Sequence, residues 1–184
     1  QNVLPFIIRT KKAGDIPKVR KLYHDAGRGE FRSMMYSWHR EVEKIGYEAS
    51  FPVCRLRYID RDLPVAVRSE FRAPFVPHDA RLSGTPGFFA DFTIENITGE
   101  TVEVSLLCKL KNPVNRGLAR RRLVNRVQNE PGRTSVVMQS SETKPYRQNG
   151  SLCLSMTGED VSFIRSDFPA YFANDVLFSD YGVT

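Results

Sequence analysis

Between residues 51 and 110 apolar and polar residues alternate with a period of two, and this pattern constrains the fold more than any other feature of the chain. Residues 53–58 and 63–71 form the first two such runs, each with one apolar face. The polar sequence Asp60-Arg61-Asp62 lies between them. Alternation of this kind is typical of antiparallel strands that are buried on one side. The two runs therefore predict a β-hairpin.

A second pair of runs follows at residues 88–95 and 102–110, separated by the turn-like sequence Asn96-Ile97-Thr98-Gly99-Glu100. We predict that these runs also form an antiparallel hairpin. Residues 73–87, in contrast, hold three prolines and two glycines. Because proline cannot donate a hydrogen bond to a sheet ladder, we predict a structured connection there rather than a central strand.

The part of the chain best suited to a helix is residues 15–45. Apolar side chains recur there at steps of three and four residues: Phe31, Met34, Met35, Trp38, Val42 and Ile45. This spacing predicts an amphipathic helix that ends at Gly46. An extended, aromatic-rich segment over Phe31–Trp38 is the alternative.

Residues 111–133 break the alternation and carry an excess of basic side chains among Asn, Gly and Pro. The basic residues are Lys111, Arg116, Arg120, Arg121, Arg122, Arg126 and Arg133. We predict a long basic loop or a short helix here. Short apolar runs at residues 135–139, 151–157 and 161–165 then predict three more strands.

These elements together predict a mainly β fold, an antiparallel β-sandwich of the supersandwich type with a little helix near the N-terminus. A length of 184 residues suits a single domain with a substantial core over residues 1–184. Hydrophobic residues make up 41% and charged residues 26%, which is typical of soluble globular proteins. We favour a cytoplasmic location. The chain begins at Gln1 without Met or a signal-peptide pattern, so we expect a piece of a longer protein.

Motifs for common catalytic centres are missing from the sequence. The histidines His24, His39 and His78 share no ligand spacing, so we expect no metal and no other cofactor. There is no GxSxG, GxGxxG or GxxxxGK[ST] sequence, and no residue is assigned a catalytic role. The three cysteines, an odd number without CxxC spacing, are interpreted as small buried apolar residues: Cys54, Cys108 and Cys153. A disulfide between two of them is left open.

Glycosidic cleavage needs a pair of carboxylates about 5 to 10 Å apart, and two groups of carboxylates are candidates for it. Asp60 and Asp62 are two residues apart and are more simply the solvated tip of a hairpin. Asp79, beside His78 and Pro77, is the better candidate for binding or catalysis. The simpler interpretation is that Asp79 caps a turn while His78 packs against the sheet.

The consecutive arginines Arg120, Arg121 and Arg122 are candidate binding residues for an anionic partner. Aromatic residues do not interleave with them, whereas single-strand nucleic-acid grooves usually combine cations with stacking rings. Nucleic acid is therefore not the favoured partner. A solvated loop or a contact with a neighbouring domain is favoured instead.

Three segments carry a resemblance to a known family. The first is Phe51-Pro52-Val53-Cys54-Arg55-Leu56 with Tyr58-Ile59-Asp60 and Leu63-Pro64-Val65, the second Glu70-Phe71-Arg72-Ala73-Pro74-Phe75-Val76-Pro77-His78-Asp79, and the third Pro86 followed by Phe89-Ala90-Asp91-Phe92-Thr93-Ile94-Glu95-Asn96. They resemble the N-terminal β-domain of family 116 glycoside hydrolases, which include non-lysosomal glucosylceramidases and β-glucosidases.

The resemblance implies a two-domain enzyme, in which a β-sandwich precedes an (α/α) helical barrel that holds the carboxylate nucleophile and acid of a retaining β-glucosidase. The chain ends before such a barrel, so no catalytic residue is carried over. We therefore expect a non-catalytic domain that supports or covers the active site of the C-terminal barrel, where the parent enzyme's carbohydrate substrate binds. One alternative is a free-standing carbohydrate- or anion-binding module. Another is a small enzyme that uses Asp79 and His78.

Overall fold

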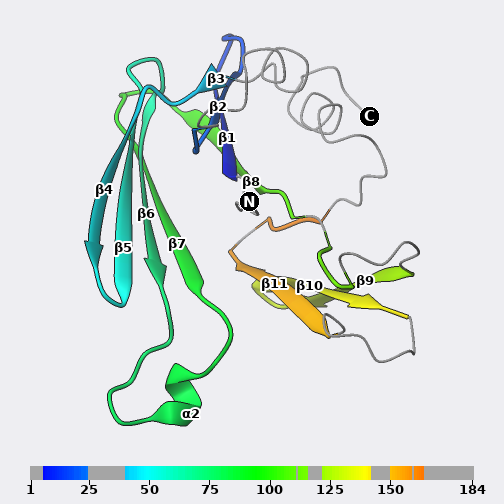
Figure 1. Ribbon diagram of the computed structural model, residues 1–184. Helices are drawn as coiled ribbons and strands as arrows, with labels where there is room; N and C mark the ends of the chain where they lie inside the picture. The colour runs from blue at the N-terminus through cyan, green and yellow to red at the C-terminus, as the bar shows by residue number, and fades with distance from the viewer. Residues whose placement is uncertain are drawn as a thin grey trace, which may run out of the picture. The chain divides into compact units, whose positions relative to one another are not determined.

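The computed structural model describes residues 6–24, 40–110, 112–115, 122–141, 150–158 and 160–163. These residues are mainly β, arranged in sheets whose pairs are antiparallel with one exception, in agreement with the predicted β-sandwich (Figure 1). The strands fall into two compact units, one with the strands up to Lys109 and the other with the strands that follow Leu110. The expectation of a single domain over residues 1–184 stays a prediction.

The larger sheet of the first unit is antiparallel throughout and has the order β4-β5-β6-β7. Its strands are β4 (Lys44–Ser50), β5 (Val53–Ile59), β6 (Val65–Arg72) and β7 (Phe89–Asn96). The predicted hairpin at residues 53–71 is confirmed, with Tyr58 opposite Val67. The connection over 73–87 is also confirmed, and it contains the short helix α2 (Ala80–Ser83).

The second sheet of this unit has the order β3-β2-β1-β8, and only β2 and β3 run parallel. Its strands are β1 (Phe6–Lys12), β2 (Lys18–Lys21), β3 (Arg40–Glu41) and β8 (Val102–Cys108). The two sheets share one apolar cluster, formed by Ile8, Leu22, Val42, Tyr58, Leu63, Val65 and Val67. Because its members come from both sheets, the cluster holds the sheets face to face.

The predicted hairpin between residues 88–95 and 102–110 is wrong, although both strands exist. β7 pairs with β6, whereas β8 crosses to the other sheet and pairs with β1. The turn itself is present, with Asn96 accepting a hydrogen bond from the backbone N–H of Thr98 and donating one to the carbonyl oxygen of Glu100. Alternation reports which face of a strand is buried and leaves its partner undefined.

The predicted helix over residues 15–45 is wrong wherever the structure describes that range. β2 and β3 lie within it, and Gly46 lies inside β4 instead of ending a helix. Val42 is buried, and its N–H donates to the carbonyl oxygen of Lys21. Of the residues with helix-like spacing that the structure describes, Val42 follows β3 and Ile45 belongs to β4. The segment Phe31–Trp38 lies outside the described residues.

The second unit contains an antiparallel sheet with the order β11-β10-β9. Its strands are β9 (Leu123–Glu130), β10 (Arg133–Ser140) and β11 (Ser151–Thr157). The predicted strands at 135–139 and 151–157 are confirmed. The predicted basic loop is wrong over 123–130, because these residues form β9. The sequence did not indicate this strand, since β9 is polar and mostly exposed and lacks the alternation that marks a half-buried strand. Residues 161–163 form no strand, and 164–165 lie outside the described residues.

Candidate functional site

The candidate pair His78 and Asp79 lies on the exposed connection between β6 and β7. Asp79 is the N-cap of α2, and its Oδ1 accepts a hydrogen bond from the backbone N–H of Leu82 at 2.8 Å. The interpretation of Asp79 as a cap is therefore confirmed. His78 is exposed with a φ of 65°, so the expectation that it packs against the sheet is wrong. Asp79 thus has a structural role as the N-cap of α2.

Of the three consecutive arginines at positions 120–122, the structure describes Arg122. Arg122 is exposed just before β9, and its carbonyl oxygen accepts a hydrogen bond from the backbone N–H of Ser141 at 2.8 Å. Arg120 and Arg121 lie outside the described residues. An anion site formed by the three arginines stays a prediction.

The most developed polar cluster involves the carboxylates that the sequence placed on a solvated hairpin tip. Asp60 has a side chain that is only 1% exposed, and its Oδ2 accepts a hydrogen bond from Nε of Arg20 at 2.8 Å. Arg20 Nη2 lies 3.1 Å from Oδ2 of Asp62, and the backbone N–H of Asp62 donates to Asp60 Oδ1. Lys18 Nζ donates to the carbonyl oxygen of Asp62. The prediction of a solvated tip is therefore wrong for Asp60.

This ion-pair network has a structural role. Arg20 belongs to β2 and Asp60 to the turn between β5 and β6, so the pair links the two sheets of the first unit. Both oxygens of Asp60 accept hydrogen bonds from protein groups, which leaves little capacity for proton transfer to a substrate. Sequence analysis missed the network because its arginine is 40 residues away from its aspartate.

Replacing Asp60 should therefore destabilise the fold strongly. Asp60→Ala leaves the buried guanidinium of Arg20 with Asp62 as its remaining carboxylate partner. Removing one partner of a buried ion pair lowers the free energy of unfolding by about 3–5 kcal/mol. The matched control is Asp91→Ala, which removes an exposed pair with Arg72 and should cost under about 1 kcal/mol. Urea unfolding of both variants measures the difference, and equal losses would show that the Arg20–Asp60 pair carries no special stability.

All three cysteines are free thiols. Cys54 and Cys108 are half-buried, whereas Cys153 is exposed. The interpretation of Cys153 as a buried apolar residue is therefore wrong. Burial raises the pKa of the Cys108 thiol to about 11. A reactive nucleophile needs the opposite shift, so Cys108 is suited to packing rather than catalysis.

The pH dependence of thiol alkylation checks this assignment. Below its pKa of about 11, the thiolate fraction of Cys108 rises about tenfold per pH unit. Alkylation of Cys108, followed by mass spectrometry of its peptide, should keep accelerating up to about pH 10. A rate that levels off near pH 8 would contradict the effect of burial.

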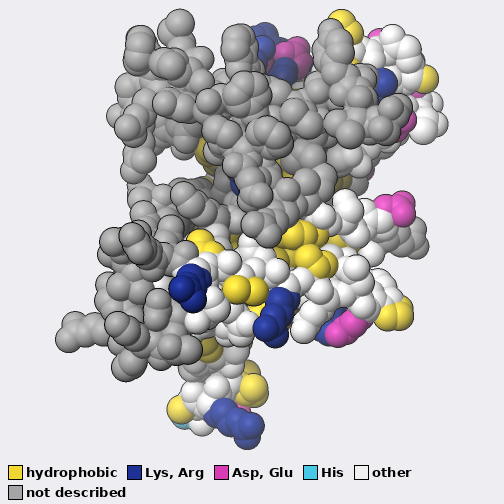
Figure 2. Space-filling model, turned by 90° about the vertical axis from the view of Figure 1, so that its right-hand side faces the viewer, with side chains coloured by type: hydrophobic (Ala, Val, Ile, Leu, Met, Phe, Trp, Pro, Cys, Tyr) yellow, Lys and Arg dark blue, Asp and Glu magenta, His cyan; other side chains and the backbone are white. Residues whose placement is uncertain are grey.

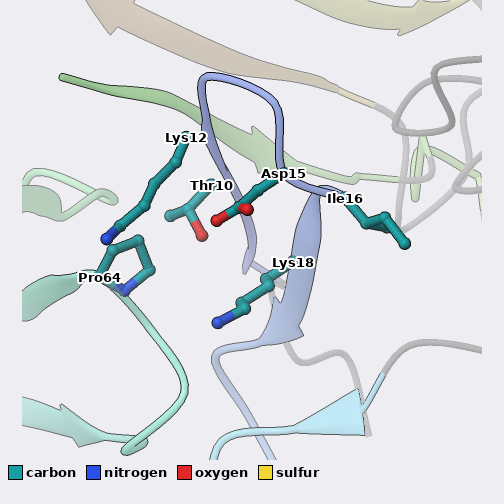
Figure 3. Close-up of a pocket in the computed structure, with 6 residues that line it drawn as sticks. All are labelled: Thr10, Lys12, Asp15, Ile16, Lys18 and Pro64. Carbon is teal, nitrogen blue, oxygen red and sulfur yellow. The ribbon is translucent and has the colours of Figure 1, made fainter. Parts of the chain in front are cut away.

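Among the described residues, a small recess lies near the β1–β2 turn (Figure 3). It is lined by Thr10, Lys12, Asp15, Ile16, Lys18 and Pro64. Lys12 pairs with Glu100 at 3.0 Å, and the recess is about the size of a single water molecule. It cannot hold a sugar ring.

The part of the chain that the structure describes contains no group of three or more His, Cys, Asp or Glu side chains arranged to hold a metal. Within the same residues, no helix has the length and apolar character needed to cross a bilayer.

Comparison with known proteins agrees with the resemblance seen in the sequence. A family model described as "beta-glucosidase 2, glycosyl-hydrolase family 116 N-term" matches residues 2–175. No curated protein matches the chain significantly.

Proposed function

The chain belongs to glycoside hydrolase family 116 and corresponds to the N-terminal domain of such an enzyme, and we propose that it is a non-catalytic β-sandwich. In this role it supports or covers the active site of its parent. The parent acts on β-glucosides or glucosylceramide-like substrates in this proposal. Its catalytic groups belong to a C-terminal helical-barrel domain on the same polypeptide.

The family match is the observation that carries this proposal, because it covers nearly the whole chain. An N-terminal domain of a glycoside hydrolase implies a catalytic domain elsewhere in the parent. The side chains described above are consistent with that division. Asp60 is held in a buried ion pair, Asp62 contacts the same arginine, and Asp79 caps a helix. The candidate carboxylates of this chain thus have structural partners.

The proposal separates the activity of the chain from that of its parent. The isolated chain should hydrolyse an aryl β-glucoside no faster than buffer does, whereas the full-length parent should release the aglycone. A chromogenic assay on both proteins at equal molar concentration measures this difference. Asp79→Asn in the full-length parent is the internal control, and its rate should stay within about twofold of the unmodified enzyme because Asn also serves as an N-cap.

Two results would count against the proposal. Turnover by the isolated chain would place catalytic groups within residues 1–184. A full-length parent that is inert toward every β-glucoside tested would remove the assignment of substrate class.

A further inference from the structure

Exposed aromatic side chains gather at one end of the β4–β7 sheet. Six aromatic residues among the described ones are more than a third exposed. Three of them lie in the β4–β5 turn or the β6–β7 connection, and a fourth is the first residue of β7. These four, here called the aromatic end, are Phe51, Phe75, Phe88 and Phe89, with exposed fractions of 44–78%. Val76 and Leu82 beside them are also exposed. Apolar patches of this kind mark interaction surfaces.

The aromatic end projects from the sheet. In Figure 1 the β6–β7 connection extends past the ends of its strands, and in Figure 2 it protrudes at the bottom of the view with hydrophobic side chains on its surface. Pairing of Val53 with Arg72, and of Arg72 with Phe89, brings the β4–β5 turn and the start of β7 to this same end. The surface is thus a knob rather than a groove.

The knob is internally braced. The rings of Phe51 and Phe75 meet edge to face with centroids 4.9 Å apart. The Ala73 N–H donates to the carbonyl oxygen of Pro52 beneath them. Ser83 Oγ donates to the carbonyl oxygen of Val76 at 2.9 Å and accepts from its N–H at 3.1 Å. A braced surface loses less conformational entropy on binding, which favours association.

Three of its charged side chains, Arg72, Asp79 and Asp91, already have partners in the structure. Arg72 donates to Asp91 at 2.7 Å and lies over the ring of Phe89, while Asp79 caps α2. Residues 71–91 contain two arginines and two aspartates, so their charges cancel with histidine neutral. A sugar needs several converging polar groups, and an anion needs net positive charge. An aromatic-rich knob without net charge is better matched to an apolar recess on a protein.

A second copy of this chain is less suitable as the partner. A symmetric dimer needs a self-complementary surface, so a projecting knob requires a recess on the same molecule. The recess near Thr10, within the described part of the chain, has room only for a water molecule and cannot receive a phenylalanine ring. The remaining partner that the family match implies is the catalytic domain of the parent.

We propose that the aromatic end seats in an apolar recess on the catalytic domain of the same polypeptide and so fixes the orientation of that domain. This inference rests on the proposed function and adds to it the surface through which support is given. Aromatic side chains are enriched in the buried centres of protein interfaces, which agrees with the exposed phenylalanines here.

Photo-cross-linking in the full-length parent tests the inference. Phe75 is replaced by the photoreactive p-benzoylphenylalanine, which keeps an aromatic ring, and the variant is irradiated and digested for mass spectrometry. The matched control carries the same group at Ile97, which is 62% exposed in the turn that follows β7, at the opposite end of that strand. We expect position 75 to form cross-links to peptides outside residues 1–184 at least tenfold more than position 97. Position 89 should repeat the result of position 75.

Mixing isotopically light and heavy parent before irradiation identifies the partner. Cross-links within one copy support the inference, whereas cross-links between copies, or none above the level of position 97, overturn it. Hydrolysis of an aryl β-glucoside is measured on the same samples. An active parent without the cross-link contradicts only the docking surface, whereas an unmodified parent without activity contradicts the proposed function itself.

Discussion

The ion pair between Arg20 and Asp60 links the two sheets of the first unit through buried charges. It joins β2 of one sheet to the β5–β6 turn of the other, with both side chains nearly excluded from solvent. Removing two charges from water is costly, so the arrangement is tolerated only because further hydrogen bonds from Asp62 and Arg20 satisfy the groups. Guanidinium–carboxylate bonds are directional, and they therefore orient the sheets that the apolar cluster holds together.

The sequence predicted the strands better than their pairing. The alternation over 53–71 reports a half-buried hairpin directly, whereas β8 needs β1 as its partner, and no local pattern connects residues 6–12 with 102–108. β9 was missed because its side chains are mostly exposed. For the candidate site, the cap formed by Asp79 was predictable from its local sequence. The burial of Asp60 was not, since it depends on a distant arginine.

These features are consistent with the proposed supporting role of the domain. A buried ion pair links its two sheets, and its candidate carboxylates serve as ion-pair partners or caps. The most prominent surface in the described part of the chain is apolar and aromatic, which suits a protein partner more than a sugar. Membership of family 116 implies a catalytic domain in the parent enzyme, and we propose that domain as the partner. In this account, the chain contributes rigidity and contact area, and the chemistry belongs to the other domain.

Locating the catalytic carboxylate in the full-length parent tests this account most directly. A retaining glycosidase forms a covalent bond between sugar and nucleophile, and a mechanism-based inactivator such as a 2-deoxy-2-fluoroglucoside traps that species. Digestion and mass spectrometry then identify the labelled peptide. The account predicts a label outside residues 1–184. A label on Asp60, Asp62, Asp79 or any other carboxylate of this chain would contradict it.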